Sequence, residues 1–90
     1  MSKYQVHQVD GNQQAIVDAL EAGGCSVEKI GRPLDLLVGK NGRSYVFEVK
    51  LPKAKLRATQ QRFLAQWKGH AGILRCVEDV RAFLREEENP

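Results

Sequence analysis

The sequence has only two cysteines, Cys25 and Cys76, and neither belongs to a Cys-x-x-Cys or Cys/His pattern. A disulfide framework or a zinc site is therefore not expected, and both residues are interpreted as buried free thiols in strand-like stretches. No apolar run approaches the length of a membrane span. Residues 1–11 are polar without an apolar centre, so no signal peptide is expected. These absences favour a cytoplasmic location and no membrane partner.

Histidine is also scarce, and the isolated His7 and His70 receive no catalytic or ligand role. The net charge is only +3, but it is unevenly distributed. Residues 50–68 carry Lys and Arg and no acid, whereas Glu86, Glu87 and Glu88 gather near the end. This pattern fits a cationic face for a polyanionic partner and equally fits a solvated loop and helix face.

The 90 residues are expected to form one α/β domain with elements in the order α-β-β-β-α-β-α. Asn41-Gly42 predicts a tight hairpin between the second and third strands. The third strand is apolar on both faces, which predicts a central position in the sheet. The expected elements are a helix capped by Asp10 or Asn12 and ended by Gly23-Gly24, strands over 25–30, 34–38 and 44–51, a helix capped by Thr59 and ended by Gly69, a strand over 71–77 and a helix over 78–85.

Three charged residues are predicted to meet at the ends of two strands. Glu48 and Lys50 are two residues apart and share one strand face, and pairing through the hairpin puts Asp35 opposite residue 48. Two carboxylates in a half-apolar cleft repel each other unless a cation lies between them. Oxygen ligands suit Mg²⁺ or Mn²⁺, and the Val49 backbone carbonyl is expected to face the same space. The alternative is that Asp35 merely begins a strand and the other two form an exposed pair.

Pro33, Asp35, Glu48 and Lys50 together resemble the signature of the PD-(D/E)xK nuclease superfamily. The segments "GRPLDLLVG", "VFEVK" and "TQQRFLAQW" look more narrowly like the VRR-NUC domain, the virus-type replication and repair nucleases. Small stand-alone members of that family occur in phages and prophages. The resemblance covers residues 10–84 approximately, and it implies that residues 1–90 form a single VRR-NUC-like domain.

The resemblance implies a restriction-endonuclease-like core with a mixed central sheet flanked by helices. It also implies a DNA endonuclease that depends on Mg²⁺ or Mn²⁺ and, for small phage members, a homodimer that resolves four-way (Holliday) junctions in the host cytoplasm. By the same resemblance Asp35 and Glu48 would bind the metal and Lys50 would be the catalytic lysine. Gln60 would match the glutamine that opens the following helix.

The sequence departs from the family pattern at two places. Leu34 separates Pro33 from Asp35, where the shortest form of the motif has the two adjacent. The family often places a glutamate on the first helix, and here Asn12 or Gln13 could supply only a neutral oxygen. The number of metal ions is therefore left open.

Four basic residues are predicted to contact DNA phosphates without reading sequence, namely Lys53, Lys55, Arg57 and Lys68. Phe63 and Trp67 are interpreted as core or dimer contacts in preference to base-stacking groups. Three alternatives stay open: a nicking or flap-processing nuclease without junction preference, a non-catalytic nucleic-acid-binding module on the same fold, and a subunit interaction protein.

Overall fold

The computed structural model describes the backbone of residues 3–88 and the side chains of residues 12–88. Within this part of the chain, three helices and four strands follow the predicted order α-β-β-β-α-β-α. None of these helices is both long and apolar enough to cross a membrane. The elements are α1 (Lys3–Ala22), β1 (Ser26–Lys29), β2 (Leu36–Lys40), β3 (Arg43–Val49), α2 (Ala58–Gln66), β4 (His70–Leu74) and α3 (Val77–Glu88).

The four strands form one mixed sheet in the order β1-β2-β3-β4. The first three strands are antiparallel to their neighbours, and β4 runs parallel to β3. The predicted central position of β3 is therefore confirmed. Leu36 pairs with Phe47, so the residue before β2, Asp35, comes opposite Glu48 as predicted.

The hairpin between β2 and β3 turns at Asn41-Gly42, as predicted. Both residues have positive φ, 54° and 80°, which is the backbone of a two-residue type I′ turn. Asparagine and glycine tolerate this left-handed conformation better than other residues. The turn sets the register of β2 against β3. This register places Asp35, just before β2, opposite Glu48 near the end of β3.

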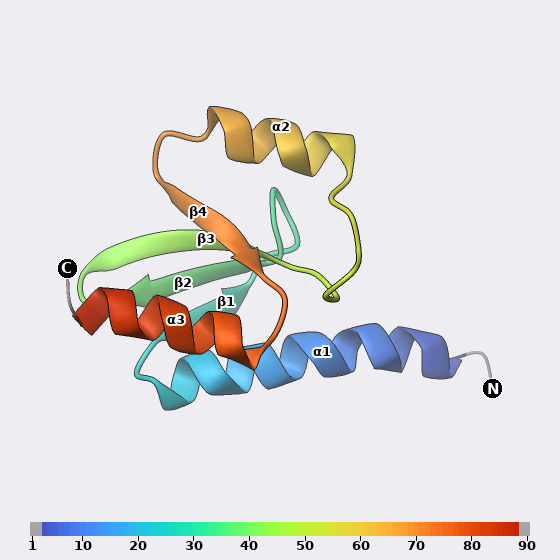
Figure 1. Cartoon of the computed structure of the whole chain (residues 1–90), viewed down its shortest axis with the longest axis horizontal. Helices are drawn as coiled ribbons and strands as arrows, with labels where there is room; N and C mark the ends of the chain where they lie inside the picture. The colour runs from blue at the N-terminus through green and yellow to red at the C-terminus, as the bar shows by residue number, and fades with distance from the viewer. Residues whose placement is uncertain (1–2, 89–90) are drawn as a thin grey trace.

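The core lies on one face of the sheet, under α1 and α3, while α2 stands on the opposite side (Figure 1). Alternation along β2 and β3 points four apolar side chains into this core: Leu36, Val38, Tyr45 and Phe47. The intervening residues Val46 and Glu48 are also buried, but they face the side on which α2 lies. A carboxylate therefore occupies the second, smaller buried layer.

Both predicted helix caps are wrong. Asp10 and Asn12 lie inside α1, which begins at Lys3 because residues 3–22 contain no proline to stop the helix. Thr59 lies inside α2, whose N-cap is Arg57. The Arg57 backbone N–H donates to the Gln60 side-chain oxygen at 2.9 Å, so a glutamine supplies part of the cap.

The bounds of the predicted strands differ in the structure by one to three residues, as at the start of β2 and the end of β4. β2 begins at Leu36 rather than residue 34, because the N–H groups of Ile30 and Gly31 bond the Asp35 carbonyl at 2.9 and 3.3 Å and close a loop. β4 ends at Leu74, because the Arg75 N–H turns to the Asp79 carboxylate at 2.8 Å.

The two cysteines are free, as predicted, but neither lies in a strand. Cys25 is buried in the connection before β1, and Cys76 is half-buried in the connection before α3.

Candidate active site

Asp35 is held at the C-terminal end of β3 by a backbone hydrogen bond. Its Oδ2 atom accepts from the Val49 N–H at 2.9 Å. The next residue, Lys50, donates its own N–H to the Leu74 carbonyl at 3.1 Å and so extends the parallel pairing with β4. The loop before β2 and the end of β3 are thus fixed to each other and to the sheet.

Glu48 is the buried centre of the group, with only 4% of its surface exposed. Its Oε2 atom accepts from the Gln60 Nε2 of α2 at 2.7 Å. The Lys50 Nζ lies 3.7 Å from the same oxygen. The predicted grouping of the two carboxylates and the lysine is therefore present, and the structure adds the glutamine from α2.

The Asp35 carboxylate lies close enough to Glu48 to affect the ionisation of Glu48. Burial is the main cause that raises the pKa of Glu48 above its ordinary value of 4.5, and the neighbouring charge of Asp35 raises the pKa further. Lys50 and the hydrogen bond from Gln60 act in the opposite direction. The negative form of Glu48 is therefore disfavoured overall, and a cation between the carboxylates would relieve this.

The donor atoms at this position fit a hard cation better than a soft one. Among residues 12–88 no group of three or more His, Cys, Asp and Glu side chains could hold a metal ion. Asp35 and Glu48 would have to share a cation with neutral oxygens, water or a substrate phosphate, which is how Mg²⁺ is usually bound. The Val49 carbonyl remains a predicted ligand, because Asp35 contacts Val49 through the Val49 N–H group.

The first helix contributes an amide beside the site. The Asn12 Nδ2 lies 3.5 Å from the Lys50 carbonyl, a long hydrogen bond between α1 and the end of β3. Gln13 is also half-buried but forms no hydrogen bond among the described side chains. Of the two predicted first-helix candidates, Asn12 is therefore the one that reaches the site.

The predicted DNA-binding residues are all exposed: Lys53, Lys55, Arg57 and Lys68. The loop that carries three of them is fixed by Arg75, which the sequence reasoning missed. Its Nη1 atom donates to the carbonyls of Leu51, Pro52 and Ala54 at 2.9, 3.3 and 2.7 Å. Only the parallel pairing of β3 with β4 brings residue 75 beside residue 51, so local sequence carries no signal for this contact.

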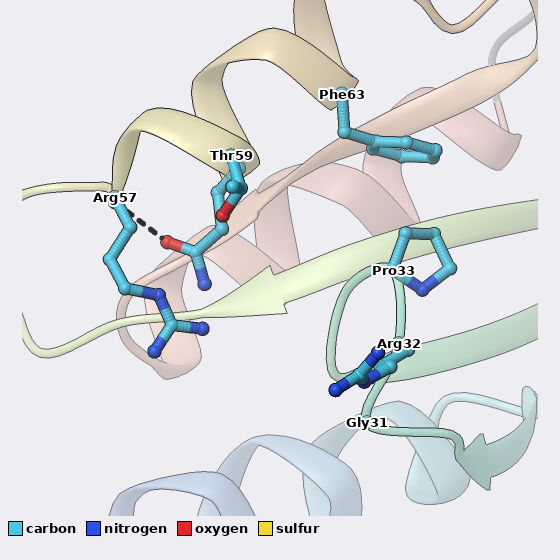
Figure 2. Close-up of a pocket in the computed structure, with 7 residues that line it drawn as sticks. Gly31, Arg32, Pro33, Arg57, Thr59 and Phe63 are labelled. Carbon is cyan, nitrogen blue, oxygen red and sulfur yellow. Dashed lines mark hydrogen bonds between the residues drawn. The ribbon is translucent and has the colours of Figure 1, made fainter.

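A cleft of about 670 Å³ opens between α2 and the loop before β2 (Figure 2). Gln60 lines this cleft and also bonds Glu48, so it lies between the cleft and the site. Arg32 was not among the predicted site residues, although its position just before Pro33 and Asp35 was a signal for it. The lining residues are Gly31, Arg32, Pro33, Arg57, Thr59, Gln60 and Phe63.

Phe63 and Trp67 stack on each other along α2, with ring centroids 5.0 Å apart and planes 28° from parallel. Phe63 is half-buried, but Trp67 is 48% exposed. The interpretation of Trp67 as a core residue is therefore wrong, because Trp67 caps the C-terminal end of a helix that stands apart from the main core. Its role as a dimer contact remains a prediction.

A comparison of the chain with protein-family models, curated proteins and solved structures found no match. Function is therefore inferred from the residues of this chain.

Proposed function

We propose that this chain is a structure-selective DNA endonuclease that hydrolyses phosphodiester bonds with the aid of Mg²⁺ or Mn²⁺. The assignment to the PD-(D/E)xK superfamily, and within it to the VRR-NUC type, belongs to the same proposal. The proposal also includes a homodimer that acts on four-way junctions. It further includes a phage or prophage origin, with the protein working in the host cytoplasm.

The observation that carries the proposal is the meeting of Asp35, Glu48 and Lys50 at one end of β3. Glu48 is buried beside a second carboxylate, and its pKa is raised by both the burial and Asp35. Two neighbouring carboxylates repel each other and do not stabilise a fold. Their presence together, with the Lys50 Nζ 3.7 Å from the Glu48 Oε2, therefore favours a role in function. Hard-cation binding followed by phosphodiester hydrolysis accounts for all three side chains.

Each residue has a distinct part in the proposed mechanism. The Val49 N–H fixes one oxygen of Asp35, and Gln60 fixes Glu48, so both carboxylates are oriented before substrate arrives. Lys50 would orient the attacking water and offset the negative charge that develops on the phosphate. A bound divalent cation would supply further positive charge to the phosphodiester and the water. The four basic residues would hold the DNA backbone nearby: Lys53, Lys55, Arg57 and Lys68.

Three alternative functions are separated by different observations. A nicking or flap-processing nuclease would use the same residues and would differ only in its DNA preference. A non-catalytic nucleic-acid-binding module would not need Lys50 beside Glu48, so the intact set favours an enzyme. A subunit interaction protein would not need an acid-free basic stretch over residues 50–68.

The test is incubation of the pure protein with end-labelled four-way, flap and linear duplex DNA, with Mg²⁺ or with EDTA. We expect cleavage only with the metal and preferentially of the four-way DNA. Equal cleavage of all branched forms would support the nicking or flap alternative. Binding without cleavage under any metal condition would support the non-catalytic module.

A further inference from the structure

The cleft lined by Gln60 combines two kinds of surface, of which the endonuclease proposal uses only Arg57, as one of several phosphate contacts. Arg32 comes from the loop before β2 and Arg57 from the start of α2, so two guanidinium groups approach from opposite walls (Figure 2). Phe63 lies further along α2 and offers an aromatic ring to the same space. Gln60 lines the same space, and its Nε2 atom donates to the Glu48 carboxylate at 2.7 Å.

The two arginines are available to an anion. Both are exposed, and neither forms an ion pair within the described side chains. Arg43 and Arg81, by contrast, each lie against a glutamate. Two unpaired guanidinium groups facing one cleft favour a ligand with negative charge, and phosphate matches their planar donor geometry.

The aromatic side of the cleft suits a flat ring. Trp67, at the end of the same helix, stacks on Phe63 and holds the Phe63 ring in a defined orientation. Nucleic-acid bases stack on such rings with little dependence on sequence. The volume of about 670 Å³ lies within the range of about 300–1,000 Å³ common for pockets that hold small organic groups.

We infer that this cleft holds one unpaired nucleotide of the DNA strand that passes Glu48, with its phosphates on Arg32 and Arg57 and its base on Phe63. The inference rests on the proposed function and names its substrate class: DNA whose strand is unpaired beside the cleavage site. In an intact duplex the bases are stacked and paired, so their faces are inaccessible unless they are flipped out. A branch point or frayed end supplies the unpaired nucleotide at lower energetic cost.

The experiment measures binding of a short oligothymidylate, with EDTA present to prevent cleavage. An abasic oligonucleotide of the same length has the same phosphates without bases. The chain has one tryptophan, so Trp67 emission reports directly on the ring stacked against Phe63. We expect the oligothymidylate, but not the abasic strand, to change this emission at a fixed protein concentration.

Variants separate the phosphate and base contacts. Phe63→Leu should weaken oligothymidylate binding about fivefold or more, as expected for loss of one base stack, and leave abasic binding unchanged. Phe63→Tyr keeps the ring and should restore binding. Arg32→Ala should weaken binding of both strands, and by more than the matched control Arg62→Ala, which removes an exposed arginine of α2 outside the cleft.

Several results would overturn the inference. These are an unchanged Trp67 emission, an equal effect of Phe63→Leu on both strands, or an Arg62→Ala effect as large as that of Arg32→Ala. The binding assay contains no metal, so it is independent of catalysis. Cleavage without base-dependent binding would therefore reject the cleft inference alone, whereas base-dependent binding without cleavage in the Mg²⁺ assay would reject the endonuclease proposal.

Discussion

At the scale of single residues, the Glu48 carboxylate lowers the stability of the fold and has a proposed role in function. It is buried beside Asp35, and both features raise its pKa. A group with a raised pKa in the folded state contributes stability below its unfolded pKa and loses that contribution as the pH rises through the folded value. At neutral pH the ionised Glu48 therefore destabilises the metal-free fold.

Glu48→Gln should consequently raise the thermal midpoint of unfolding at pH about 7 in EDTA, because it removes a buried charge. The glutamine oxygen can still accept from Gln60. The gain should shrink as the pH falls toward the ordinary value of 4.5, because the raised pKa lets the folded wild-type carboxyl become neutral above that pH. The same variant should lose cleavage by about 100-fold or more. Thermal unfolding across pH, together with the junction assay, measures both effects.

The matched control is Glu28→Gln on β1, where the glutamate is exposed. It should leave the midpoint and the cleavage rate nearly unchanged. A Glu48→Gln protein that is less stable than wild type at every pH would contradict the electrostatic account of this residue.

Lys50→Ala tests the catalytic lysine. Its side chain is only 17% exposed and lies 3.7 Å from Glu48, so it faces the site rather than the bulk solvent. We expect cleavage to fall by about 100-fold or more while DNA binding changes little. Comparing single-turnover cleavage with binding in EDTA separates the two. Activity within a few-fold of wild type would remove Lys50 from the mechanism.

At the scale of elements, the segment between β3 and α2 is an ordered basic loop. Arg75 bonds three of its carbonyls from the end of β4, and the Gln60 side chain caps the start of α2 that follows. The loop therefore presents Lys53, Lys55 and Arg57 from a fixed backbone at the end of the strand that carries Glu48.

Neutralising Lys53, Lys55 and Arg57 together should flatten the slope of log affinity against log salt. Each phosphate contact contributes about 0.9 to this slope with duplex DNA, so a loss of about 2 to 3 is expected. The loss should be independent of DNA sequence. Fluorescence anisotropy of labelled duplex over a salt series measures this slope.

A second variant controls for net charge by neutralising three exposed basic residues of other elements, namely Lys29, Arg62 and Arg81. Equal slopes in the two variants would place the DNA surface elsewhere.

At the scale of the whole molecule, the small core leaves large apolar side chains exposed, namely Ile30, Leu37, Leu51 and Trp67. Trp67 lies at the end of α2, outside the core cluster. A two-fold contact through this helix would place two copies of the site at a fixed separation, as paired cuts across a branch point require. The proposed four-way substrate therefore requires the dimer.

We predict a homodimer at micromolar concentration and tighter binding of four-way DNA than of linear duplex. Trp67→Ala should shift the equilibrium toward the monomer, whereas Leu37→Ala, which removes an exposed leucine on β2, should not. Sedimentation equilibrium measures the mass against the monomer value of 10.1 kDa. A monomer with and without DNA would contradict the dimer. A dimer that binds both DNAs equally would contradict junction selectivity alone.

The amino-acid sequence by itself determined the order of elements, the Asn41-Gly42 hairpin and the approach of Asp35 to Glu48. These depend on short-range rules, namely turn conformation and the alternation of side chains along paired strands. The tertiary structure decided the bond from Gln60 to Glu48, the contacts of Arg75 with the basic loop, the cleft beside Arg32 and the exposure of Trp67. Each depends on where α2 packs and on the parallel pairing of β4 with β3, and local sequence patterns do not specify such long-range arrangements.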